Sequence, residues 1–135
     1  MEDKYKLAVG LDFDGVIHSY TSGWQGEDII SDPPVKGVKW AIGQLRRTAG
    51  YKVIVWSTRC KTKHGREAIR KWLIKWEIEV DDIVLYKPVC SCYVDDRAVT
   101  FNGDWAQTII DIMSFRNYIE CKEKKNESKI NGDGT

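Results

Sequence analysis

Short apolar runs alternate along the chain with stretches in which apolar residues recur every three or four positions. The runs Lys6–Leu11 and Lys52–Trp56 have the length and composition of buried strands. Between them, apolar residues recur at helical spacing over Val38–Leu45, and Gly50 is a natural end for that helix. This alternation predicts parallel strands that are connected by helices.

The pattern continues in the second half of the chain. The apolar face of the clearest helix consists of Ala68, Ile69, Trp72, Leu73 and Trp76. Strands are expected at Ile83–Tyr86 and Ser91–Val94, with Val99–Phe101 as a candidate edge strand, and a last helix over Trp105–Tyr118 with Asp104 as its N-cap. The predicted fold class is therefore α/β: a single Rossmann-like, three-layer domain around a parallel sheet of about four or five strands.

Length and composition limit the class of protein. A chain of 135 residues is long enough for one domain with a single core, expected over residues 1–120. Residues 121–135 are polar and are expected to form a disordered tail. A net charge of +1 argues against a protein that mainly coats nucleic acid.

No apolar run approaches the ~18 residues of a membrane span, and Met1–Lys4 lacks the order of charges of a signal peptide. A cytoplasmic protein without a membrane partner is the expectation. The four cysteines, Cys60, Cys90, Cys92 and Cys121, are then expected to be reduced thiols. The spacing of Cys90 and Cys92 is too short for a usual zinc hairpin, and no second pair accompanies it.

Two carboxylates stand at the end of the first strand. If the strand continues through Asp12, alternation places Asp12 and Asp14 on one side, with Phe13 toward the core and Gly15 allowing a sharp turn. Like charges this close need a cation or a proton, and Mg²⁺ suits carboxylates. An acidic turn without chemistry is the alternative; a calcium loop would need oxygen ligands where Val16 and the next residue stand.

Polar residues also follow two other predicted strands, with Ser57 after the second and Asp95 and Asp96 after the strand that ends at Val94. The carboxyl ends of strands are where open α/β sheets bind ligands. Taken together, these residues resemble the haloacid dehalogenase-like superfamily of phosphoryl-transfer enzymes. The motifs that carry the resemblance, in the family's order, are Asp12–Val16, Val53–Ser57, Lys87 and Val94–Asp96. The resemblance extends from about residue 7 to about residue 104, and Val16 departs from it because many members have Thr there.

The resemblance implies a role for each motif. Asp12 would attack phosphorus and become an aspartyl-phosphate, and Asp14 would give a proton to the leaving oxygen and later take one from water. Ser57 would hydrogen-bond a phosphoryl oxygen, and Lys87 would neutralise charge on the phosphate.

The implied cofactor is Mg²⁺, held by Asp12, Asp95, Asp96 and the main-chain carbonyl of Asp14, with Asp96 expected to bind directly. Further candidates for contact with phosphate or substrate are Gly15, Thr58, Arg59 and Trp24.

Many relatives insert a cap domain after the first motif, whereas here only residues 18–35 are available, a segment that we call the flap. So short a segment implies an open site. Trp24, in the flap, is as consistent with an anchor as with a residue that stacks on substrate. The basic stretch Arg59–Arg66 is either solvated surface or attracts an anionic substrate, and His18 and Arg97 would contact substrate or the neighbouring carboxylates.

The leading interpretation is a Mg²⁺-dependent phosphomonoester hydrolase. Its substrate would be a nucleotide, a sugar phosphate or the phosphate at a nucleic-acid end. A non-catalytic phosphate-binding or regulatory module that retains the fold is the alternative from another class. A mutase, which would need a cap, and a dehalogenase, which would not need Asp14, are the other enzymes to weigh.

Overall fold

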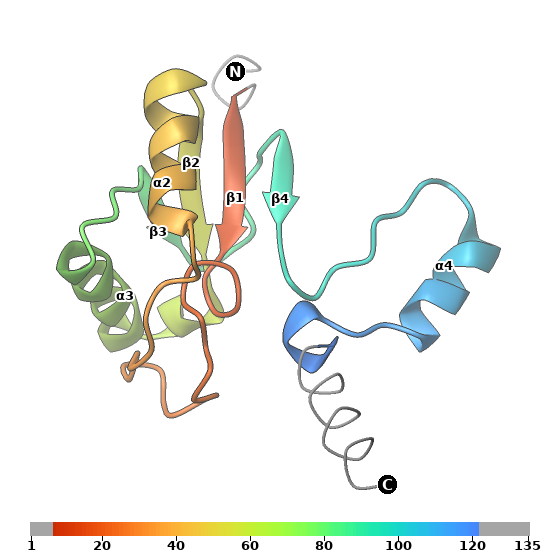
Figure 1. Ribbon diagram of the computed structural model, residues 1–135, viewed down its shortest axis with the longest axis horizontal. Coiled ribbons are helices and arrows are strands. Elements are labelled where there is room, and N and C mark those ends of the chain that lie inside the picture. Colours follow the sequence, from red (N-terminus) through yellow and green to blue (C-terminus); the bar gives the residue numbers. More distant parts are fainter. Residues whose placement is uncertain (1–6, 122–135) are drawn as a thin grey trace, which may run out of the picture. The chain divides into compact units, whose positions relative to one another are not determined.

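The computed structural model of the protein describes residues 7–121. The chain divides into two compact units, Met1–Asp95 and Asp96–Thr135. The first unit contains a four-stranded, all-parallel sheet in the order β3-β2-β1-β4 (Figure 1). The strands are β1 (Ala8–Asp12), β2 (Lys52–Trp56), β3 (Asp82–Val84) and β4 (Cys92–Val94). The predicted α/β class with a parallel sheet is confirmed.

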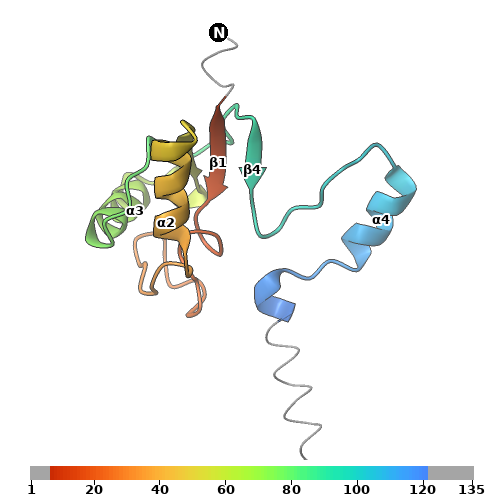
Figure 2. The same ribbon diagram turned by 45° about the horizontal axis from the view of Figure 1, so that its top comes forward.

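Strand β1 lies inside the sheet, between β2 and β4. Its Leu11 pairs with Val55 of β2 and with Val94 of β4, so the three strands end at nearly the same level. The flap begins at this end of the sheet, beyond the arrowhead of β1 (Figures 1 and 2). The residues that follow each strand therefore meet at one edge.

Three helices have the positions that the pattern predicts. Helix α2 (Val38–Gly43) continues as a π-helical segment, η1 (Gln44–Thr48), and α3 (Lys63–Lys75) follows β2. In the second unit, α4 (Trp105–Met113) begins at the predicted cap, where the Asp104 side chain accepts from the backbone N–H of Gln107 (3.2 Å).

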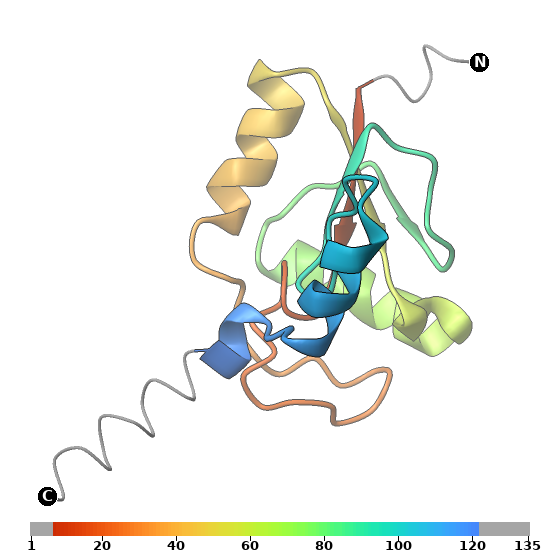
Figure 3. The same cartoon turned by 90° about the vertical axis from the view of Figure 1, so that its right-hand side faces the viewer.

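The core lies on one face of the sheet. Its strand residues are Val9, Leu11, Phe13, Val53 and Val55, and its helix residues include Ile42, Ile69, Trp72 and Leu73. Because Val9, Leu11 and Phe13 alternate along β1, a single face carries them, and α2 and α3 both pack on that face. Figure 3 shows α2 to one side of β1. Asp12 belongs to the opposite set of positions, as predicted.

Some boundaries differ from the prediction. Strand β3 ends at Val84 and not at Tyr86, since β2, its partner, ends at Trp56 opposite Val84. Helix α4 ends at Met113, where the Ser114 hydroxyl donates to the Ile110 carbonyl. The edge-strand prediction at residues 99–101 is wrong, because no strand forms there.

Residues 122–135 of the predicted tail lie outside the described part of the chain, so the expected boundary near residue 120 stays a prediction. Among the described residues, no helix is both long and apolar enough to cross a bilayer.

Candidate active site

A tight loop follows β1 and sets the direction of the acidic side chains. The carbonyl oxygen of Phe13 accepts from the backbone N–H groups of Val16 (3.3 Å), Ile17 (2.9 Å) and His18 (3.0 Å). Gly15 sits inside this loop at φ 88°, a conformation that residues with a Cβ rarely adopt. The predicted glycine turn is therefore present directly after Asp14.

Three carboxylates gather at the ends of β1 and β4. Asp12 is the last residue of β1, Asp95 directly follows β4, and Asp96 is the next residue along the chain. Each offers one oxygen within 4.8 Å of the others, and all three side chains are half-buried. One oxygen of Asp96 is buried and has no hydrogen-bond partner among the described residues. Such a cluster has the charge and the donor atoms for a hard divalent cation.

Asp14 is held by two side chains. Arg59 donates from Nε to Oδ2 of Asp14 (2.8 Å) and from Nη2 to Oδ1 (3.1 Å), which is a two-point ion pair. His18 donates from Nδ1 to Oδ1 (2.8 Å). The other ring nitrogen of His18, Nε2, accepts the backbone N–H of Asp32 (3.2 Å), which fixes the proton of the ring on Nδ1.

These contacts decide the charge of Asp14. Burial alone raises the pKa of Asp14, but the hydrogen bond from His18 and the ion pair with Arg59 outweigh it and hold the pKa below its usual value. The carboxyl group is therefore ionised in the structure at neutral pH. An ionised carboxylate is the form that a general base needs.

Arg59 ties Asp14 to the flap. Its side chain is fully buried. Its Nη1 donates to three carbonyl oxygens of the flap, those of Gly26 (2.7 Å), Glu27 (2.9 Å) and Ile29 (3.3 Å). The ring of Trp24 covers the guanidinium, with its centroid 4.7 Å from Cζ. The predicted role of Arg59 in phosphate binding stays a prediction, and the contacts described here are all internal.

Asp32 holds the flap near its C-terminal end. Its side chain accepts from the backbone N–H (2.8 Å) and the hydroxyl (2.6 Å) of Ser22, and its carbonyl oxygen accepts from Nε1 of Trp72 in α3 (3.1 Å). Through its own N–H, Asp32 also contacts His18. The flap is thus fastened to α3 as well as to the loop after β1.

Ser57 and Thr58 stand at the end of β2. Ser57 is buried, and its hydroxyl oxygen accepts from the backbone N–H of Arg59 (3.2 Å), which caps the 3₁₀-helical segment η2 (Thr58–Lys61). A hydroxyl accepts and donates at once, so Ser57 keeps a proton for an acceptor such as a phosphoryl oxygen. Thr58 is exposed.

Lys87 lies between β3 and β4, with Nζ 4.1 Å from the centroid of the Tyr93 ring. That ring occupies the space beside Gly10, where a Cβ atom would come within 2.8 Å of it. The Tyr93 hydroxyl donates to the carbonyl of Pro88 (2.7 Å). Lys87 is exposed, and its ammonium group lies near the Tyr93 ring. Because Gly10 and Asp12 are two residues apart on β1, the Tyr93 ring lies on the same face of the sheet as Asp12.

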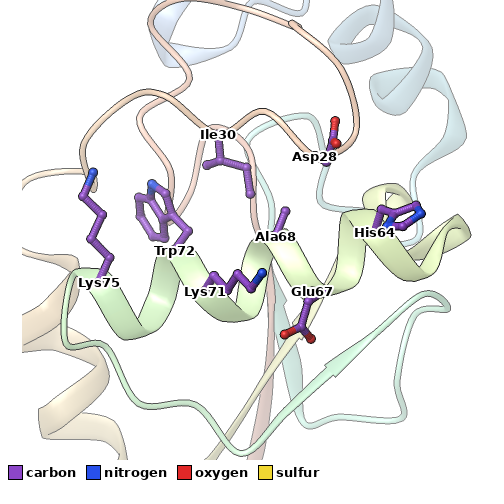
Figure 4. A pocket seen from close by; sticks show the side chains of 8 residues that line it. All are labelled: Asp28, Ile30, His64, Glu67, Ala68, Lys71, Trp72 and Lys75. Atoms are coloured by element: carbon purple, nitrogen blue, oxygen red, sulfur yellow. The ribbon is translucent and has the colours of Figure 1, made fainter.

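A pocket of about 400 Å³ opens between the flap and α3 (Figure 4). Its lining residues are Asp28, Ile30, His64, Glu67, Ala68, Lys71, Trp72 and Lys75. In Figure 4, Ile30 extends from the flap toward the side chains of α3, and Asp28 also comes from the flap. Of the basic stretch Arg59–Arg66 only His64 lines this pocket, and none of Asp12, Asp95 and Asp96 does, so the pocket is separate from the acidic cluster.

Sequence reasoning missed two residues that shape the site. Asp32 precedes two prolines, and nothing in that local sequence indicates its contact with His18. Gly65 lies in the first turn of α3, and a Cβ atom there would come within 1.9 Å of the Arg59 carbonyl oxygen. An isolated glycine in a helical pattern is the signal of such a close approach.

The structure shows an α/β domain with a four-stranded parallel sheet, and the resemblance to a family stays a prediction. Comparisons with protein-family profiles, curated proteins and solved structures find no match to this chain.

Proposed function

We propose that the protein is a Mg²⁺-dependent phosphomonoester hydrolase that works through an aspartyl-phosphate on Asp12. The observation that carries the proposal is the cluster of Asp12, Asp95 and Asp96 at the carboxyl ends of two adjacent parallel strands. Three carboxylates at a strand edge are costly to a fold unless a cation or solvent compensates their charge. Phosphoryl transfer uses such a cation together with a nucleophilic oxygen.

The metal has suitable ligands. Asp12, Asp95 and Asp96 would hold the ion, because each offers one carboxylate oxygen within 4.8 Å of the others and Mg²⁺ prefers such oxygen ligands. One buried oxygen of Asp96 has no hydrogen-bond partner within residues 7–121, which supports a direct role for that residue. Bound there, the ion would neutralise charge on the phosphoryl group.

In the first step, an oxygen of Asp12 attacks phosphorus and the bond to the ester oxygen breaks. Asp14 gives its proton to that leaving oxygen, so that an alcohol departs. In the second step, water attacks phosphorus, its proton returns to Asp14, and the bond to Asp12 breaks. Ser57 and Lys87 would hold the phosphoryl oxygens throughout.

The ion pair with Arg59 favours the second of these roles of Asp14. A lowered pKa keeps Asp14 ionised, and the ionised carboxylate is the form that takes a proton from water, but it also makes that carboxylate a weaker base. The acid role needs a proton on Asp14, and the negative charge of an arriving phosphate opposes the effect of Arg59 because like charges raise the pKa of a carboxyl group. We therefore expect that bound substrate raises the pKa of Asp14 and so favours its protonation.

The proposal is tested by phosphate release from three classes of substrate: nucleotides, sugar phosphates and end-phosphorylated oligonucleotides. Each is measured with Mg²⁺ and with a chelator. Release that requires Mg²⁺ is expected for at least one class. Absence of release from every class, with a folded protein that binds Mg²⁺, would contradict the proposal.

A non-catalytic phosphate-binding module is the second candidate. The contact that favours it is the Asp14–Arg59 ion pair, because it gives Asp14 a structural use without any proton transfer. Calorimetry with inorganic phosphate and Mg²⁺ separates the two candidates when combined with the release assay. Binding without release from any substrate would favour the module.

A further inference from the structure

We infer that Arg59 is a positioning residue that makes Asp14 and the flap one mechanical unit, so that the flap is a fixed wall of the site and does not open as a lid. The inference rests on the proposed function for the role of Asp14, and on contacts alone for the flap. It concerns the loop after β1, the segment η2 and residues 18–35.

The first support is the completeness of the Arg59 network. The guanidinium is fully buried, and a buried cation needs both a counter-charge and partners for its N–H groups. Asp14 supplies the counter-charge, and three carbonyl oxygens of the flap accept hydrogen bonds from Nη1. A movement of the flap would therefore leave N–H groups of a buried cation without partners. That cost opposes opening.

The second support is that the flap is fastened at other points. At its base, Ser19 donates its backbone N–H to Pro33 (2.9 Å), and Val35 donates to Ile17 (2.8 Å). Next to this base, the carbonyl oxygen of Asp32 accepts from Nε1 of Trp72. Contacts at the base, at Asp32 and at Arg59 therefore restrain most of the flap from moving.

The third support is that the backbone of Arg59 is fixed as well. Its N–H donates to the hydroxyl of Ser57, and its carbonyl oxygen lies against Gly65, so close that no Cβ atom would fit. Arg59 is thus held from the end of β2 and from the first turn of α3. A residue fixed at both its backbone and its side chain can orient Asp14 precisely enough for proton transfer.

Trp24, as part of the flap, then lies on the fixed wall of the site. Its ring covers Arg59 with one face, and the side chain is 54% exposed. The leaving group that Asp14 protonates would depart along this wall.

The test uses the full chain and the variant Arg59→Lys, which keeps the positive charge but loses the two-pronged geometry. Arg70→Lys, on the exposed side of α3, is the matched control. Hydrogen exchange of the backbone amides over residues 22–30 is measured by mass spectrometry without substrate. Exchange is expected to become about tenfold faster or more in Arg59→Lys and to stay unchanged in Arg70→Lys.

The second measurement is the ratio of turnover on glycerol 2-phosphate to turnover on p-nitrophenyl phosphate. The nitrophenolate leaves without a proton, so a misplaced Asp14 lowers this ratio, by about tenfold or more. A general loss of folded protein lowers both rates equally and leaves the ratio unchanged. If Arg59→Lys proves unstable, Trp24→Ala takes its place in the exchange measurement. That variant changes an exposed side chain and removes the ring that covers the guanidinium.

Unchanged exchange over residues 22–30 would overturn the inference, as would faster exchange with an unchanged ratio in an active enzyme. If the wild-type protein releases no phosphate from any substrate, the proposed function fails, and the exchange measurement still decides whether Arg59 clamps the flap.

Discussion

The carbonyl oxygen of Arg59 lies 1.9 Å from the point that a Cβ atom of Gly65 would occupy. This close approach brings the first turn of α3 against the segment η2 and holds Arg59 where its side chain reaches Asp14. The neighbour is backbone, so a larger residue at position 65 cannot be accommodated by the rotation of a side chain.

Gly65→Ala is expected to be destabilising, by about 1–3 kcal/mol, because the extra methyl group forces η2 and α3 apart. Gly43→Ala is the control, since the three atoms nearest to a Cβ atom there all belong to the guanidinium end of the flexible Arg47 side chain. In the helical setting of Gly43, alanine is expected to be neutral or stabilising. Urea unfolding of the two variants checks the difference, and equal midpoints would contradict the described packing.

Asp12 and Asp14 are expected to differ in their effect on stability. Asp14→Asn removes the counter-charge of buried Arg59 and should cost about 2–3 kcal/mol, less than for a fully buried pair because Asp14 is partly exposed. Asp12→Asn relieves repulsion among three carboxylates and should be neutral or stabilising without metal.

Unfolding of the two variants in a chelator gives the comparison. A larger loss for Asp12→Asn than for Asp14→Asn would mean that the ion pair does not carry the stability assigned to it.

Much of the fold was predictable because it depends on local periodicity. The alternation along β1 predicts that Phe13 is buried and that Asp12 belongs to the other face, and both hold. Parallel strands also bring their ends to one edge, which is why the neighbourhood of Asp12 and Asp95 could be expected.

The role of Arg59 could not be predicted in the same way. In the sequence it begins a basic stretch, and nothing local separates it from Lys61 or Lys63, which are exposed. Its burial arises from the flap carbonyls and Asp14, which are distant in sequence. The short helix α2 shows a similar limit, because the π-helical turn that follows it leaves no mark in the apolar spacing.

Asp81 is expected to make stability depend on pH. Burial raises its pKa, but hydrogen bonds from Arg46 and from the backbone N–H of Val53 (2.7 Å) outweigh this and lower the pKa. A carboxyl group with a lowered pKa in the folded state stabilises the protein above its unfolded-state pKa, about 3.9. This contribution is lost as the pH falls through the lower folded-state value.

Asp81→Asn should therefore lower the free energy of unfolding by about 1 kcal/mol above pH ~5 and by less as the pH falls below ~4. Glu79→Gln is the matched control, since Glu79 pairs with the same Arg46 but its side chain is 82% exposed. Its effect should stay within about 0.5 kcal/mol. Equal losses for the two variants at neutral pH would contradict the assignment.

Mg²⁺ is expected to raise the melting temperature of the wild-type protein, because it binds the folded acidic cluster and relieves its repulsion. Asp96→Ala should abolish this rise, since Asp96 carries the buried oxygen without a hydrogen-bond partner in the described part of the chain, whereas Asp95→Ala should weaken it less. Thermal unfolding across a Mg²⁺ titration checks the ranking. The reverse order would exchange the roles of the two residues.

Asp12 is the proposed nucleophile of a phosphomonoester hydrolase. The most direct test of this role is the rate of Mg²⁺-dependent phosphate release by Asp12→Asn relative to wild type, on the best substrate found and with intact mass showing no deamidation. A loss of about 10³-fold or more is predicted, in a variant that remains folded, because the amide keeps the volume of the side chain but does not attack phosphorus. A rate within about tenfold of wild type would contradict the account, since an interaction essential to the chemical step cannot cost so little.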